Sequence, residues 1–83
     1  MKVALHSHAK ERLVERGTTE AEVVATVTSG EEFPAKFGRT GFRRNFGFQK
    51  RWRGRFYANK QVTAFAVGEA DGWLVITVIV RYF

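Results

Sequence analysis

The sequence contains no cysteine, one proline and one methionine among its 83 residues. Without cysteine the chain has neither a disulfide nor a thiolate metal site, and a reducing cytoplasm is its expected compartment. Its longest apolar run, Trp73 to Val80, is far shorter than the ~18 to 20 residues of a membrane span. Residues 1–9 include no apolar segment typical of a signal peptide. These absences predict a cytoplasmic protein with no membrane partner.

The motifs of several enzyme classes are also missing. The sequence has no nucleophile elbow, no phosphate-binding glycine loop, no metal-binding constellation and no catalytic pair of carboxylates. His6 and His8 alone make a poor metal site. Hydrolysis by a metal or a serine triad is therefore unsupported, and we expect neither a metal nor another cofactor.

What the chain does contain is apolar and positively charged. Its length fits one domain over residues 1–83, and a hydrophobic content of 45%, with eight phenylalanines and two tryptophans, can supply a dense core. Fourteen lysines and arginines against eight acidic residues give a formal net charge of +6. Such a charge favours anionic partners, such as nucleic acid or an acidic protein.

The first expected helix covers about residues 8–16. Its apolar residues lie on one side at helical spacing, and charged residues make up the remainder. His6 or Ser7 can cap the start of this helix, and Gly17 can end it.

A second helix is expected over about residues 20–29. Thr19 and Glu22 have the spacing of a capping box, and Gly30 closes the segment. Its three valines and two threonines lower intrinsic helicity, so the helix should depend on packing against a sheet.

After Pro34 the apolar period changes to that of strands. The expected strands cover residues 42–48, 54–59, 60–67 and 73–82. The segments "QKRWRG" and "EADG" read as turns, the latter with the Asp-Gly pair of a hairpin. In the last strand the residues that point to either face of the sheet are apolar, as in a central strand. We therefore predict an α+β domain in which two N-terminal helices pack on one face of a three- to four-stranded antiparallel sheet.

Residues 38–56 form a basic stretch without a single acid. Phenylalanines and Trp52 are interleaved with its cations, a combination typical of single-stranded RNA binding. The alternative is that the aromatics fill the core and the arginines are simply the solvated side of a strand. One charge sign over nineteen residues is unusual for an ordinary surface, so we predict an RNA-binding role for its arginines. They are Arg43, Arg44, Arg51, Arg53 and Arg55.

His8 is the candidate general acid or base, because imidazole can accept and donate a proton near neutral pH. Arg12 lies one helical turn further on and faces the same way, where it can hold a phosphate or an acidic neighbour. Lys60 and Thr77 are polar residues on apolar strands and require partners. We expect His6 only to cap the helix, and His8 to project toward the strands near Thr77 or Lys60. RNA supplies its own 2′-OH nucleophile, so these groups suffice for its cleavage.

Three segments resemble the family of small proteins named as domain of unknown function 4258. They are "HAKERLVERG" at 8–17, the capped acidic helix with "EV" at 22–23, and the ending "GWLVITVIVRYF" with its Thr-Val at 77–78. The likeness extends over nearly the whole chain, and Thr18 departs from the isoleucine usual in the family. That family is thought to be similar to the RelE-like ribonuclease toxins of bacterial toxin–antitoxin pairs.

The resemblance implies a RelE-like fold and an endoribonuclease restrained by an antitoxin protein. Its motif falls on His8, Arg12, Arg16 and Thr77, with Lys60 as a weaker match. Arg16 can instead be structural, because an arginine before a helix-ending glycine can bond the last carbonyls. Two alternatives stay open: a non-catalytic RNA- or protein-binding module that uses the same basic face, and a domain that has lost its activity and kept an interaction surface.

Overall fold

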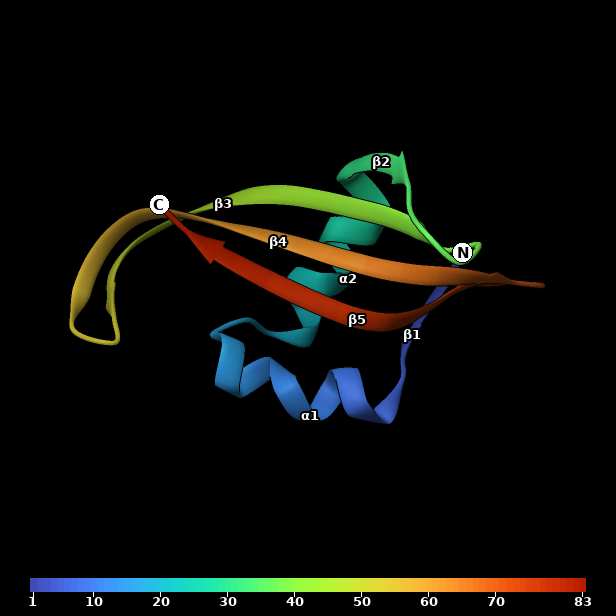
Figure 1. The fold of residues 1–83 in the computed structure, drawn as a ribbon, viewed down its shortest axis with the longest axis horizontal. Helices are drawn as coiled ribbons and strands as arrows, with labels where there is room; N and C mark the ends of the chain where they lie inside the picture. The colour runs from blue at the N-terminus through green and yellow to red at the C-terminus, as the bar shows by residue number, and fades with distance from the viewer.

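The fold is a five-stranded sheet with two helices on one face (Figure 1), described for residues 1–83 by a computed structural model. The strands stand in the order β1-β5-β4-β3-β2, with β1 parallel to β5 and all other neighbours antiparallel. The elements are β1 (Lys2–Leu5), α1 (Ser7–Arg16), α2 (Glu20–Ser29), β2 (Glu31–Pro34), β3 (Thr40–Trp52), β4 (Arg55–Glu69) and β5 (Gly72–Tyr82).

This architecture confirms the predicted α+β class with two helices and corrects the sheet. We expected three or four antiparallel strands, but the sheet has five strands and is mixed. The two that sequence patterning missed, β1 and β2, have four residues each, which is too short for a clear alternation of apolar and polar positions. The expected strands at 54–59 and 60–67 are one continuous strand, β4.

Both helices begin with the caps expected from the sequence. His6 is the N-cap of α1, and Gly17 ends that helix in the left-handed conformation with φ 76°. Thr19 and Glu22 form the complete capping box of α2, which ends at Gly30. Because only two residues separate Gly17 from α2, the helices must turn sharply into one another.

The core lies between the helices and the middle of the sheet. Cross-strand partners share a face, and the central ladder places Phe42 opposite Ala64 and Ala64 opposite Val78. The ten buried apolar residues of this cluster are Ala9, Leu13, Val23, Val27, Phe42, Val62, Ala64, Ala66, Val75 and Val78. The opposite face of the sheet has no helix over it (Figure 1).

The long β3–β4 hairpin bends away from the flat part of the sheet and toward α1 (Figure 1). A register shift between Gly47 and Lys50 inserts an extra residue, with Gln49 at φ 48°. The hairpin closes through Arg53 and Gly54, whose φ values of 53° and 83° are those of a type I′ turn. This turn lies within the predicted "QKRWRG" segment, and Arg53 of the turn lies beside the C-terminal end of α1.

Candidate active site

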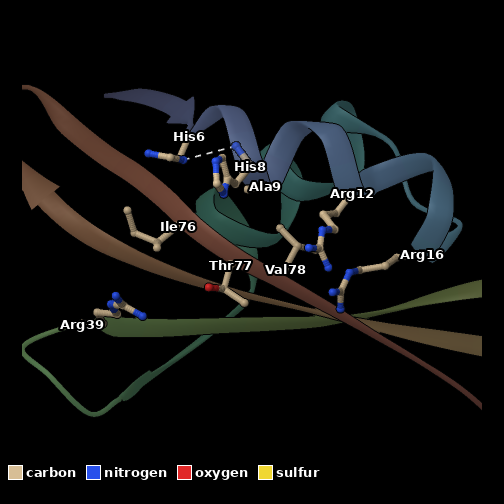
Figure 2. A pocket seen from close by; sticks show the side chains of 9 residues that line it. All are labelled: His6, His8, Ala9, Arg12, Arg16, Arg39, Ile76, Thr77 and Val78. Atoms are coloured by element: carbon tan, nitrogen blue, oxygen red, sulfur yellow. Dashed lines mark hydrogen bonds between the residues drawn. The ribbon is translucent and has the colours of Figure 1, made fainter.

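A pocket of about 350 Å³ lies where β1 leaves the sheet and α1 begins (Figure 2). The parallel pairing of β1 with β5 reaches only Val75, whose carbonyl accepts from the backbone N–H of His6. From that point α1 replaces β1 as the neighbour of β5, and the space between helix and strand is the pocket. Its lining is His6, His8, Ala9, Arg12, Arg16, Arg39, Ile76, Thr77 and Val78.

The polar lining from α1 is a stripe along one side of the helix. His8, Arg12 and Arg16 are four residues apart, so their side chains follow one another along the helix toward its C-terminal end (Figure 2). The stripe lies next to Ala9 and Leu13, which are buried against the sheet. Packing of these two residues thus turns the three polar side chains toward β5.

Both histidines line the pocket, but only the side chain of His6 caps α1. The Nδ1 atom of His6 accepts a hydrogen bond of 3.2 Å from the backbone N–H of His8, which confirms the predicted cap. Their rings meet edge to face with centroids 5.3 Å apart. His8 lines the pocket together with Thr77, as expected, but His6 lines it too. The capping bond occupies Nδ1 of His6 and leaves Nε2 without a hydrogen-bond partner.

Three arginines bring positive charge to the pocket without an acidic partner. The ion pairs of the structure are Lys10–Glu20, Arg43–Glu31 and Lys60–Glu22. None of them involves Arg12, Arg16 or Arg39. In addition, the Nε atom of Arg16 is buried and has no hydrogen-bond partner. Unpaired guanidinium groups around one hollow form an anion-binding arrangement.

Sequence reasoning did not select Arg39 as a site residue. It follows the short turn after β2 and approaches the pocket from the side of β5 opposite to α1 (Figure 2). The turn between β2 and β3 reaches β5 across the uncovered face of β4, beside Phe65, and no spacing in the sequence encodes that crossing. The one available signal was its membership in the acid-free stretch 38–56.

Lys60 lies outside the pocket, in contrast to the sequence interpretation that grouped it with His8. It is buried, with 5% of its surface exposed, on the helix-covered face of β4. Its ammonium donates at 2.8 Å to the carbonyl oxygen of Gly17 and at 2.8 Å to the carboxylate of Glu22. Burial alone raises the pKa of Glu22, but hydrogen bonds from Lys60 and Thr18 and the Lys60 charge bring it below 4.5. These contacts give Lys60 a structural role.

The expected RNA-binding arginines of β3 are remote from the histidines. Arg43 forms an ion pair with Glu31 of β2, and Arg44 donates to the hydroxyl of Ser29 at 3.0 Å. Strand β3 is separated from β5 by the whole of β4. Both arginines therefore lie toward the opposite edge of the sheet from the pocket.

Each of the three arginines at the hairpin turn contacts a different group. Arg51 donates to the carbonyl of Gly54, and Arg55 lies over the ring of Tyr57. Arg53 donates at 3.0 Å to the carbonyl of Glu15 at the end of α1 and lies over Trp52. Of the five predicted RNA-binding arginines, Arg53 is the one that the fold brings next to α1.

A shallow hollow beside Arg53 continues the pocket along α1. It is lined by Glu15, Arg16, Trp52, Arg53, Val80 and Tyr82, and it shares Arg16 with the pocket. The Tyr82 ring stacks on Trp52 at 5.1 Å, and its hydroxyl donates to the carbonyl of Arg16 at 2.6 Å. Burial, and next the charge of Glu22, raise the pKa of Tyr82 above 10.0 against the opposing effect of Arg53. The phenol therefore stays protonated and holds the end of α1.

Taken from the residues alone, the pocket can bind an anion and move protons. Two imidazoles, three unpaired guanidinium groups and the Thr77 hydroxyl surround one space. Comparison with protein-family models, curated proteins and solved structures gives no match to the chain. No helix of the structure has the length and apolar character needed to cross a membrane.

Proposed function

We propose that the protein is a metal-independent endoribonuclease that cleaves RNA by attack of a 2′-hydroxyl on the adjacent phosphate. One observation carries the proposal: two histidines and three arginines without ion-pair partners line the same pocket. A phosphodiester is the anion that such a set fits, because RNA brings its own nucleophile and needs only charge stabilisation and proton transfer.

The arginines hold the scissile phosphate. Arg12 and Arg16 approach it from α1, and Arg39 from the other side of β5. A guanidinium group can donate two parallel hydrogen bonds to phosphate oxygens and keeps its charge at every physiological pH. The same groups offset the additional negative charge that develops on the oxygens as the 2′-oxygen attacks.

His8 carries the proton. Its neutral imidazole takes the proton of the 2′-hydroxyl as the bond from the 2′-oxygen to phosphorus forms, and the resulting imidazolium donates that proton to the 5′-oxygen as the bond from phosphorus to that oxygen breaks. The products are a 2′,3′-cyclic phosphate and a 5′-hydroxyl, and the reaction consumes no net proton. His6 has a different part: because its Nδ1 accepts the capping bond, its ring proton is on Nε2, which donates a hydrogen bond to the phosphate.

The RNA chain extends from the pocket along α1. The neighbouring hollow shares Arg16 and adds Arg53 and the stacked pair of Trp52 and Tyr82. Cations beside aromatic rings suit a single strand, whose phosphates and bases need both kinds of contact.

The sequence resemblance to domain of unknown function 4258 supports the same proposal. It implies a RelE-like toxin whose activity is restrained by an antitoxin protein, and the α+β arrangement of two helices on a sheet is compatible with that. Expression of the protein should then arrest growth, and a protein encoded beside it should relieve the arrest. Relief by an unrelated acidic protein to the same extent would argue against a dedicated antitoxin.

The direct test is cleavage of a mixed-sequence single-stranded RNA in the presence of EDTA. His8→Asn should lower the rate roughly 100- to 10,000-fold, the usual share of a general acid or base. His6→Asn separates capping from the Nε2 hydrogen bond, because asparagine is a good N-cap and lacks the imidazole ring. We expect it to keep the melting temperature and to lose a smaller factor in rate than His8→Asn, because it removes a hydrogen-bond donor to the phosphate and not the proton carrier.

Two results would change the proposal. Full activity in His6→Asn would return His6 to a purely capping role. RNA binding by the folded parent without cleavage, with or without ribosomes, would favour the non-catalytic binding module.

A further inference from the structure

A second hollow, of about 400 Å³, opens on the sheet face that the helices leave uncovered. It is lined by Phe33, Ala35, Lys36, Phe37, Arg39, Phe65 and Thr77. Arg39 and Thr77 also line the histidine pocket, so the two hollows adjoin at β5. The histidine pocket is polar and positively charged, whereas three of the seven residues here are phenylalanines. A ligand that enters both hollows must join an anionic group to an apolar one.

Two of these phenylalanines form a fixed wall. Phe33 of β2 and Phe65 of β4 are half-buried, and their rings meet edge to face at 6.1 Å. Phe33 lies directly over Gly41, where a Cβ atom would come within 2.3 Å of the ring. The absence of a side chain at Gly41 therefore lets the ring lie flat against the sheet, which sets the floor of the hollow.

The third phenylalanine, Phe37, stands at the rim without a packing role. It is 87% exposed and belongs to no aromatic pair in the structure. It occupies a turn in which the N–H of Arg39 donates to the carbonyl of Lys36, and Phe37 and Gly38 have φ values of 61° and 68°. These are the values of a type I′ turn, whose first central position favours Asn, Asp or Gly.

Phe37 thus breaks two rules of protein stability at once. A bulky side chain at positive φ is strained, and an exposed ring gains nothing from burial. Residues that lower stability in this way cluster at functional sites, because their side chains contact a ligand instead of packing in the fold. Cations on both sides of the turn, Lys36 and Arg39, indicate that the ligand is anionic.

We propose that this hollow binds a nucleobase, which Phe37 covers against the wall of Phe33 and Phe65, while the phosphate of the same nucleotide lies in the histidine pocket. The inference rests on the proposed function and specifies the part of the RNA that the second hollow recognises. A base is flat and largely apolar on its faces, and it is joined through ribose to the phosphate. Arg39, which lines both hollows, lies where the base and the phosphate meet.

The experiment compares two probes that differ only in the base: adenosine 5′-monophosphate and ribose 5-phosphate. Base stacking predicts that the parent binds the nucleotide about 5- to 100-fold more tightly. Phe37→Asn should abolish this preference and leave the affinity for ribose 5-phosphate unchanged. It should also raise the melting temperature, because asparagine accepts positive φ. Phe37→Trp should keep the preference, with indole fluorescence quenched by the nucleotide and not by ribose 5-phosphate.

Phe56→Ala is the matched control, since Phe56 is 59% exposed and does not line this hollow. It should leave the preference for the nucleotide intact. Equal affinities of the parent for both probes, or a preference that survives Phe37→Asn, would overturn the base site while the phosphate site stands. Failure of both probes to bind the parent would overturn the phosphate site and the proposed function with it. Self-association of the parent that Phe37→Asn abolishes would show instead that the patch joins two copies of the chain.

Discussion

The ammonium of Lys60 in β4 lies 2.8 Å from the carboxylate of Glu22 in α2. The same ammonium bonds the carbonyl of Gly17 at the end of α1, while Glu22 lies in the first turn of α2 and also accepts from Thr18. A charge that bridges three elements fixes how the helices lie on β4. The two partners differ in burial, because Lys60 is enclosed and Glu22 is partly exposed.

The difference in burial predicts unequal losses of stability. Glu22→Ala leaves a buried ammonium without its counter-ion and should lower the free energy of unfolding by about 2 to 4 kcal/mol. Lys60→Met removes the buried charge and leaves Glu22 with its bonds from Thr18 and Thr19, so its loss should be less than about 1.5 kcal/mol. Urea unfolding at pH 7 measures both values. A loss for Lys60→Met as large as that for Glu22→Ala would contradict this account.

The lowered pKa of Glu22 predicts a loss of stability in acid. Because the folded pKa is below 4.5, folding favours the ionised carboxylate. The resulting stabilisation is fully present above the unfolded pKa and is lost as the pH falls through the folded pKa. Glu22→Gln should therefore show a shallower decline of the free energy of unfolding between pH 5 and pH 3 than the parent. Parallel curves for the two proteins would mean that other carboxylates determine the acid transition.

Gly17 is predicted to be intolerant of any side chain. A Cβ atom there would come within 2.0 Å of the Tyr82 hydroxyl oxygen, at a residue with φ 76°. Gly17→Ala should therefore cost the ~1 to 2 kcal/mol of left-handed backbone and an additional clash. Gly38→Ala is the matched control, because φ there is 68° and no atom lies within 4 Å. Thermal unfolding should show the larger fall for Gly17→Ala, and equal falls would rule out the clash.

RNA affinity should depend on the arginines of the pocket more than on those of β3. If Arg12 and Arg39 contact phosphate, their double replacement by alanine should reduce the slope of log affinity against log salt by about two. The corresponding replacement of Arg43 and Arg44, which bond Glu31 and Ser29, should change the slope by less than one. Titrations of a mixed-sequence RNA at several salt concentrations distinguish the pairs. The opposite order would restore the sequence-based assignment to β3.

Local structure in this protein follows from short-range patterns. The capping box of Thr19 and Glu22, the end of α1 at Gly17 and the alternation along β3 and β4 are encoded within a few residues, and all are present in the fold. The stripe of His8, Arg12 and Arg16 belongs to this group, because a helical period is enough to align it. The net charge of +6 likewise follows from the composition and does not depend on the fold.

Only the tertiary structure decided which of these groups meet. The parallel return of β1 to β5 places His6 and His8 beside Thr77, and the turn between β2 and β3 brings Arg39 to them across the uncovered face of the sheet. The strand order separates Arg43 from the pocket and buries Lys60 against Glu22, although both resemble site residues in the sequence. The reason is physical: helix caps and strand alternation depend on neighbours in the chain, whereas strand order depends on which apolar faces can be buried together. That choice is made by the whole core at once, so no local pattern records it.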